Sequence, residues 1–207
     1  MKKEERKKHW DAIYTGKKHT EFSWYQQVPE TSLRYFEALN LPSTAKIIDI
    51  GGGSSFLVDY LLDLGYQDIT VLDISETALN KSKERLGERA DKVTWIVSDI
   101  TDFKPNKRYD FWHDRAAFHF LSSEKDIQSY VSIANQGLSK QGYMLIGGFS
   151  LDGPEKCSGI PVVQYSEQAM TDVFNPHFKK LECVTVNHTT PSEKVQNFIF
   201  CSFKKHS

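Results

Sequence analysis

The segment best suited to bind a ligand is a glycine-rich stretch, Asp49-Ile50-Gly51-Gly52-Gly53-Ser54-Ser55. It follows the apolar run 46–50, which its pattern predicts to be a buried strand, and precedes a helical pattern over 56–64. A turn between them needs residues without a Cβ, because the backbone must adopt unusual angles and let a ligand approach closely. In a sheet built from such units, ligands bind beyond the carboxyl ends of the strands, where this loop would lie.

Acidic side chains stand at the ends of the next two predicted strands. Asp73 lies 22 residues after Gly51, near the spacing of a ribose-binding acid, and Asp99 follows the third strand. Because parallel strands end at one edge of a sheet, we expect both carboxylates beside the glycine loop, flanked by Ile74 and Ile100. The alternatives are structural: Asp73 as a partner of the following helix terminus, and Asp99 as a loop cap.

A polar run follows the fourth predicted strand, at the place that would face the reacting atoms. Asp114 and Arg115 are charged residues beside an apolar strand, which predicts either a functional pair or an ion pair that shapes the loop. His119 is a candidate proton acceptor, or a histidine that packs against a helix. These three residues are the predicted catalytic set.

The elements that must position these side chains follow from the hydrophobic pattern. Predicted strands cover 46–50, 68–72, 93–97, 109–112 and 143–146, and predicted helices cover 56–64, 76–89, 124–138 and 166–174. Strands separated by helices imply a parallel sheet with right-handed crossovers. The runs 181–186 and 197–203 have no helix between them, so they should pair as a hairpin. We therefore expect an α/β fold: a Rossmann-like three-layer sandwich, with a seven-stranded mixed sheet and a C-terminal antiparallel hairpin, in one domain over 1–207.

The spacing of the loop separates two classes of ligand. A dinucleotide-binding loop has a third glycine three residues after the second, and Phe56 occupies that position. The loop instead resembles the Asp-x-Gly-x-Gly-x-(Gly/Ser) loop of class I S-adenosylmethionine (SAM)-dependent methyltransferases. The resemblance extends over essentially the whole chain and implies SAM as cofactor and S-adenosylhomocysteine (SAH) as product. Asp73 would bind the ribose, Asp99 the adenine amino group, and Ile100 would cover the ring. The implied cofactor contacts are Asp49, Gly51, Gly53, Ser55, Asp73, Ile74, Asp99, Ile100 and Asp114.

The first 40 residues are predicted to form a helical, aromatic lid. Trp24 and Tyr25 are candidates to hold a sulfonium by cation–π attraction, and Trp24 is assigned to the cofactor site. A cluster of basic residues at the start of the chain predicts the solvated face of an N-terminal helix. These residues are Lys2, Lys3, Arg6, Lys7 and Lys8.

A narrower resemblance concerns the methyl acceptor. The patterns Trp10-Asp11-x-x-Tyr14 and Asp114-Arg115-x-x-Phe118 resemble the small lysine methyltransferases that act on elongation factors and citrate synthase, and their bacterial relatives. The stretches 153–159 and 188–191 resemble relatives of the citrate synthase enzyme. Cys157 and His188 are accordingly expected in the wall on the acceptor side. The acceptor would be a protein lysine or a small molecule.

Composition narrows the classes of partner. The 207 residues carry 26 Lys and Arg against 27 Asp and Glu, so no global field favours nucleic acid or an anionic membrane. No run reaches the roughly 18–20 apolar residues of a membrane span. The three cysteines, Cys157, Cys183 and Cys201, show no Cys-x-x-Cys spacing. Neither a disulfide framework nor a metal site is therefore expected, and a cytoplasmic location fits best.

Two functions other than methyl transfer stay open from the sequence. The residues of the loop and the strand ends argue for binding SAM, so a SAM-binding regulator without transfer activity satisfies them equally. A nicotinamide oxidoreductase is disfavoured by Phe56 and by the terminal hairpin. The fourth strand also lacks the Asp/Asn-Pro-Pro-Tyr/Phe sequence of enzymes that methylate amino groups of nucleic acids, so no nucleic-acid substrate is expected.

Overall fold

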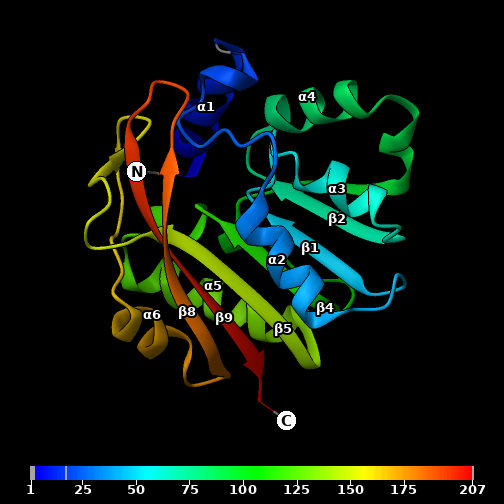
Figure 1. The fold of residues 1–207 in the computed structure, drawn as a ribbon, viewed down its shortest axis with the longest axis vertical. Coiled ribbons are helices and arrows are strands. Elements are labelled where there is room, and N and C mark those ends of the chain that lie inside the picture. Colours follow the sequence, from blue (N-terminus) through cyan, green and yellow to red (C-terminus); the bar gives the residue numbers. More distant parts are fainter. Residues whose placement is uncertain (1–2, 17, 207) are drawn as a thin grey trace.

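A seven-stranded sheet forms the centre of the protein, in a computed structural model that describes residues 3–16 and 18–206. The strand order is β3-β2-β1-β4-β5-β9-β8 (Figure 1). Strands β1 to β5 are parallel, β9 runs antiparallel to β5, and β8 runs antiparallel to β9. This confirms the Rossmann-like fold with its C-terminal hairpin. The strands are β1 Lys46–Ile50, β2 Asp68–Asp73, β3 Val93–Val97, β4 Tyr109–Arg115, β5 Leu138–Phe149, β8 Phe178–Thr189 and β9 Val195–Lys205.

Helices cover both faces of this sheet, which makes three layers. Side chains alternate between the faces along each strand: Ile47 packs with one group of helices, and Ile48 with the other. Trp112 is fully buried on the second face and donates its indole N–H to Tyr130 Oη at 3.0 Å. Figure 1 shows α2 in front of the strands and α5 behind them. The first face carries α2 Glu30–Leu39, α3 Leu57–Asp63 and α4 Glu76–Leu86, and the second carries α5 Glu124–Gly137 and α6 Glu167–Phe174.

Several elements end at residues other than those predicted. Strand β4 continues through His113 and Asp114 to Arg115, because these polar residues are buried and still pair with β1 and β5. The hairpin strands are each longer than predicted, for the same reason: pairing, not residue type, sets their length. Helix α4 ends at Leu86, since Gly87 takes a positive φ of 57° and a 3₁₀ turn, Gly87–Lys92, follows.

The N-terminal segment forms helix α1, Lys3–Thr15, a short 3₁₀ turn, His19–Glu21, and a loop that leads to α2. The prediction of a helix is confirmed, although Lys2 lies outside the described residues. The prediction that Arg6 belongs to a solvated face is wrong: its side chain is 13% exposed and lies against Asp99 and Asp126. Across the part of the chain that is described, no helix is long and apolar enough to span a membrane.

A disulfide links Cys183 on β8 to Cys201 on β9, so the expectation of no disulfide is wrong. The two cysteines are 18 residues apart, with no motif that marks them as a pair. They are, however, directly opposite each other in the antiparallel register of the hairpin. That register depends on the pairing of the whole hairpin, which spacing alone does not reveal. Cys157 is free and buried.

Removing this disulfide should destabilise the fold. We expect Cys183→Ser to lower the free energy of unfolding by about 3 kcal/mol, the chain-entropy value for a loop of this length. Urea denaturation with and without dithiothreitol measures the effect. Reductant should destabilise the wild type by a similar amount and leave the Cys183→Ser variant unchanged; equal sensitivity of both proteins would contradict the assignment.

Candidate cofactor and acceptor site

A cavity opens over the carboxyl ends of the parallel strands, between α1 and the hairpin. The space between its walls is about 870 Å³ when the opening to solvent is included. Its lining includes seven of the predicted site residues: Trp24, Gly51, Asp73, Ile74, Asp99, Ile100 and Arg115. The other predicted site residues, Asp49, Gly53, Ser55, Asp114 and His119, lie around the cavity and not in its lining.

The glycine loop is fixed by contacts that only glycine allows. Gly51 has a φ of +66°, and a Cβ there would lie 2.6 Å from Ala117 Cβ. Gly53 has a φ of +32°, and its Cβ would lie 2.6 Å from Asp73 Oδ2. Gly52, which the loop pattern leaves unspecified, would place a Cβ 2.5 Å from Asp49 Oδ2. Gly52 and Gly53 therefore keep the loop close to the carboxylates of Asp49 and Asp73, and Gly51 keeps it close to Ala117.

Ser55 and Arg85 hold the far end of this loop. Ser55 Oγ accepts a hydrogen bond from Leu57 N at 3.1 Å, so this residue serves the start of α3 instead of the cavity. Arg85 on α4 donates to Ser54 O at 3.3 Å and Ser55 O at 2.7 Å, and pairs with Asp59. Sequence reasoning missed Arg85, because it lies on the helix after the second strand.

Asp73 stands at the end of β2, buried and facing the cavity. Its Oδ1 accepts a hydrogen bond from Ser75 N at 2.8 Å. Burial raises the pKa of Asp73 to about 7, and the nearby Asp49 and Asp11 add to this, although the Ser75 amide opposes it. A carboxylate that is so poorly solvated is suited to accept hydrogen bonds from a ligand.

Asp99 performs its structural role and remains available to a ligand. Its Oδ1 accepts hydrogen bonds from the backbone N and Oγ1 of Thr101, at 2.9 and 2.8 Å, which cap a 3₁₀ turn, Ile100–Asp102. Its Oδ2 is buried and has no hydrogen bond to any described residue, although it lies 3.1 Å from Arg6 Nη2. An acceptor atom left over in this way fits an amino group of a bound ligand.

Asp49 lies below the glycine loop, where it belongs to a buried network. Its Oδ1 is 2.6 Å from His113 Nδ1, and His113 Nε2 is 2.8 Å from Ser32 Oγ on α2. These contacts tie β1, β4 and α2 together beneath the site. The structure thus gives Asp49 a supporting position, in contrast to the direct cofactor contact expected from the sequence.

Asp114 fixes the loop that follows β4. Its Oδ1 accepts hydrogen bonds from Ala117 N at 2.9 Å and Phe118 N at 3.1 Å, and its Oδ2 accepts one from Tyr130 Oη at 2.7 Å. Burial raises the pKa of Asp114 to about 6, although these donors oppose the shift. Both oxygens are engaged by these donors, so hydrogen bonds, and not the alternative of an ion pair with Arg115, shape the loop.

Arg115 lines the cavity and His119 does not. Arg115 donates to Trp24 O at 2.9 Å, and burial lowers its pKa. His119 is fully buried; its Nδ1 accepts a hydrogen bond from Phe149 N at 3.3 Å, and burial lowers its pKa to about 3. A neutral histidine outside the lining is poorly placed to take a proton from a ligand. The catalytic roles of both residues stay predictions.

Aromatic rings close the cavity from the side of α1. Trp10 lies edge-to-face with Trp24 at 6.0 Å and with Phe120 at 5.0 Å. Trp24 therefore reaches the site as expected, whereas Tyr25 packs on Phe56 outside the lining. From the sequence, Trp10 is a weaker candidate for the site than Trp24, because the position of a residue on a helix does not show what that helix covers.

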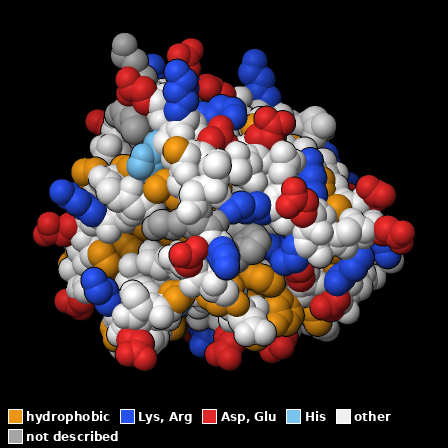
Figure 2. Space-filling model, turned by 90° about the horizontal axis from the view of Figure 1, so that it is seen from above, with side chains coloured by type: hydrophobic (Ala, Val, Ile, Leu, Met, Phe, Trp, Pro, Cys, Tyr) orange, Lys and Arg blue, Asp and Glu red, His pale blue; other side chains and the backbone are white. Residues whose placement is uncertain are grey.

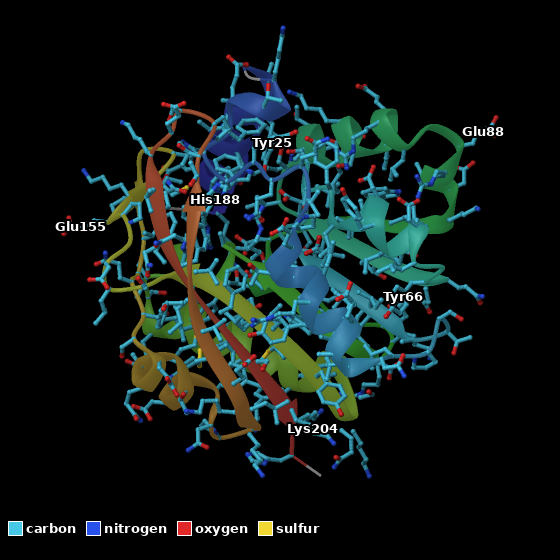
Figure 3. All side chains as sticks on the ribbon, in the orientation of Figure 1. Tyr25, Tyr66, Glu88, Glu155, His188 and Lys204 are labelled. Carbon is cyan, nitrogen blue, oxygen red and sulfur yellow. A yellow bond between two sulfur atoms is a disulfide. The ribbon has the colours of Figure 1, made fainter. Side chains whose placement is uncertain are left out.

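Of the two residues expected in the wall on the acceptor side, only Cys157 lines the cavity. His188 lies next to it in the fold but outside the lining, with Nε2 2.7 Å from Ser23 O, and Figure 3 shows it near the loop that carries Tyr25. Other lining residues that the sequence did not single out come from β5 and β9, namely Phe149, Gln196 and Phe198. Only the antiparallel pairing of these strands brings them to the site.

Asp11 anchors α1 over the cavity. Its Oδ1 accepts hydrogen bonds from Ser75 Oγ at 2.6 Å and Thr77 N at 3.4 Å, at the start of α4. Partial burial raises the pKa of Asp11, but hydrogen bonds from Lys7, Ser75 and Thr77 outweigh it and lower the pKa overall. Asp11 thereby holds the helix that carries Trp10 and Tyr14 against the site.

Loss of this anchor should loosen the lid. We expect Asp11→Ala to weaken SAM binding about tenfold, because two hydrogen bonds of about 0.5–1.5 kcal/mol each hold α1 in place. Calorimetric titration measures the change. Glu4→Ala, an exposed substitution on the same helix, is the control and should bind normally. Normal binding by Asp11→Ala would show that α1 needs no such anchor.

Comparison with known proteins agrees with the fold and the loop. Residues 47–142 match a methyltransferase domain family. The eEF1A lysine and N-terminal methyltransferase of Mus musculus is 34% identical over 98 residues, covering 46% of this chain and 14% of that protein. Malonyl-[acyl-carrier protein] O-methyltransferase 2 of Ilyobacter polytropus is 26% identical over 107 residues, covering 51% of this chain and 40% of that enzyme. This chain thus spans well under half of either relative.

A solved structure shares the fold over the full chain. The 1,6-didemethyltoxoflavin-N1-methyltransferase of Burkholderia thailandensis, solved with S-adenosylhomocysteine, superposes with a TM-score of 0.74 at 15% identity, covering 100% of this chain and 92% of that one. The strand order, the glycine loop and the domain match over 47–142 agree with the fold and the loop expected of class I SAM-dependent methyltransferases. The methyl donor of this class is S-adenosylmethionine, as the sequence resemblance implied.

Proposed function

We propose that this protein transfers the methyl group of SAM to a nucleophile. The observation that carries the proposal is the meeting of three features at one cavity: the glycine loop, Asp73, and Asp99, whose Oδ2 faces Arg6 but accepts no hydrogen bond from the described residues. Each matches one part of SAM, and none of them matches the third-glycine requirement of a dinucleotide. The residues present therefore fit the cofactor.

The cofactor contacts can be assigned residue by residue. Asp73 would accept hydrogen bonds from the ribose hydroxyls, and Asp99 Oδ2 from the adenine amino group, with Ile74 and Ile100 against the ring. Arg115 would pair with the carboxylate of the methionine portion, since it lines the cavity and the other lining cation, Arg6, is paired with Asp99 and Asp126. This assignment moves Arg115 from the catalytic set to the cofactor set.

The protein's own part in the reaction is to align and to exclude water. SAM, when bound, supplies a methyl group activated by its sulfonium. Trp10 and Trp24 shield that position from solvent, and the aromatic faces favour a cation. Asp114 keeps the loop after β4 in the shape that holds Arg115 and Ala117 beside Gly51. Alignment of two reactants is itself a large part of such catalysis.

Calorimetric titration with SAM, SAH and NAD tests the proposal. Micromolar binding of SAM and SAH without NAD is the expected result. Absence of SAM and SAH binding would overturn it, and binding of NAD alone would favour an oxidoreductase. Measurement of SAH release distinguishes an enzyme from a SAM-binding protein without transfer activity. Release faster than that of a Gly52→Val protein, whose loop is disrupted, supports an enzyme.

Three further parts of the proposal come from the sequence. The acceptor is a protein lysine or a small molecule. The chain is one domain over 1–207, with residues 1–40 as its lid; of these, residues 1–2 and 17 lie outside the described part. A cytoplasmic location stays a prediction, as does the absence of a nucleic-acid substrate.

A further inference from the structure

One end of the cavity is neutral and aromatic, and it lies beyond the residues assigned to the cofactor. We call this the neutral end; it is formed by Phe120, Phe149, Cys157, Gln196 and Phe198. Phe149 and Phe198 are direct partners across β5 and β9, with ring centroids 4.8 Å apart. Gln196 is two residues from Phe198 on the same strand, so the two side chains share a face.

The charges around the cavity disfavour a cationic acceptor. Among the described lining residues, the only acids are Asp73 and Asp99, both at the cofactor end. The same lining contains the cations Arg6 and Arg115, and the methyl donor itself is a sulfonium. A lysine ammonium would therefore be desolvated between cations without a carboxylate to pair with it. Aromatic faces return only about 0.5–2 kcal/mol of that cost.

Apart from the two carboxylates assigned to the cofactor, the described lining offers no base that would remove a proton from lysine. Tyr14 and Cys157 are the remaining residues there that could lose a proton, and burial raises the pKa of each, so both stay protonated at neutral pH. His119 lies outside the lining. A productive acceptor must consequently bring a lone pair that is available at neutral pH without help from the protein.

Gln196 supplies the polar recognition at this end. Its Oε1 is buried without a hydrogen-bond partner in the described structure. A buried acceptor atom of this kind is costly unless a ligand donates to it. A single amide among aromatic walls is typical of small-molecule sites, where a few polar groups fix orientation and apolar walls provide contact area.

The distribution of charge on the outer surface also favours a small-molecule acceptor. Figure 2 looks down on the molecule from the side of α1, and acidic and basic side chains are interspersed over the part that it describes. An acidic groove, which would attract the flank of a lysine-bearing protein segment, does not stand out among the described residues of this face. The interior of the cavity, therefore, carries the specificity.

Building on the proposed function, we propose that the methyl acceptor is a small planar molecule that packs against the aromatic wall of the neutral end, donates a hydrogen bond to Gln196, and attacks through an atom unprotonated at neutral pH. Such an atom is an aromatic thiolate or a ring nitrogen. Its lone pair forms the new bond to the methyl carbon, and the carbon–sulfur bond breaks with its electrons going to sulfur. SAH leaves as a neutral thioether, and no protein base takes part.

The test compares two probes on protein saturated with SAH. 2-Naphthol is planar and neutral, and n-butylammonium has the chain and charge of a lysine side chain. We expect 2-naphthol to bind at least tenfold more tightly in calorimetric titration. Phe198→Asp, which places a carboxylate at the neutral end, should weaken 2-naphthol at least tenfold. Val195→Asp adds the same charge to the same strand at a position that is 62% exposed, and should leave 2-naphthol binding unchanged.

The outcomes separate the two proposals. If SAH binds and n-butylammonium equals or exceeds 2-naphthol, the inference about the acceptor is overturned while the proposed function stands. If Phe198→Asp binds SAH normally and 2-naphthol as the wild type does, the neutral end is not the acceptor site. If SAH itself does not bind the wild type, the proposed function fails first. SAH release with 4-nitrothiophenolate, but not with Nα-acetyl-lysine amide, would extend the support from binding to transfer.

Discussion

Replacing Asp73 by asparagine is expected to weaken SAM binding about 100-fold and, at pH 8, to stabilise the ligand-free protein. Hydrogen bonds to a charged acceptor contribute roughly 1.5–3 kcal/mol each. Asparagine accepts at only one atom and carries no charge, so a loss of about 3 kcal/mol, or a factor of about 100, follows for a pair of ribose hydroxyls.

The effect on stability has the opposite sign because the ionised carboxylate is buried. The pKa of Asp73 in the folded protein is about 7, against about 4 in an unfolded chain. A carboxyl group whose pKa is raised by folding favours the folded state below pH 4, and this contribution is lost as the pH rises through 7. Asparagine cannot ionise, so its advantage should be present at pH 8 and vanish near pH 4.

Two measurements check this prediction. Thermal unfolding of the ligand-free proteins should give Asp73→Asn a melting temperature higher by about 2–4 °C at pH 8, the shift that about 1 kcal/mol produces in a protein of this size. Calorimetry should show weaker SAM binding, and the wild type should itself lose affinity as the pH falls below 7. Asp91→Asn, at an exposed position, is the control. Unchanged SAM affinity in Asp73→Asn would remove the ribose assignment.

Asp114→Ala is expected to lower the free energy of unfolding by at least about 3 kcal/mol. The substitution leaves Ala117 N, Phe118 N and Tyr130 Oη without their shared partner, and each unsatisfied buried group costs about 1–3 kcal/mol. Asp114→Asn keeps a carbonyl oxygen for the two backbone amides and offers its own N–H groups to Tyr130 Oη. This second variant should lose only about 1 kcal/mol.

The pair of variants also decides between two roles for Asp114. A positioning residue predicts that Asp114→Asn retains most SAH release, because the loop keeps its shape. A general base predicts that Asp114→Asn folds normally and is inactive. Urea denaturation and SAH release, measured on both variants, give the answer. A stable, inactive Asp114→Asn protein would restore the catalytic role predicted from the sequence.

Local pattern was sufficient for the core of the fold and for the cofactor end of the site. The alternation of apolar strands with helical segments predicted the parallel sheet, and the absence of a helix after residue 181 predicted the hairpin. Gly51, Asp73 and Asp99 each lie at the end of a strand or within two residues of it, so their position in the sequence already fixes which edge of the sheet they occupy.

What required the tertiary structure depends on contacts between distant elements. Asp49 and Asp114 look like site residues by position, yet their oxygens are taken by His113 in one case and by Tyr130 and the following loop in the other. Sequence position places a residue at a strand end but does not say which neighbours satisfy it. The burial of Arg6 against Asp99 likewise depends on where α1 lies.

The neutral end of the cavity and the disulfide depend on strand register. Phe149 meets Phe198, and Cys183 meets Cys201, because the antiparallel pairing of β5, β9 and β8 aligns them. A shift of one residue would turn these side chains to the opposite face. By itself, the sequence determined a SAM-type loop on a Rossmann-like sheet. The neutral, aromatic end of the cavity forms only because β9 pairs with β5.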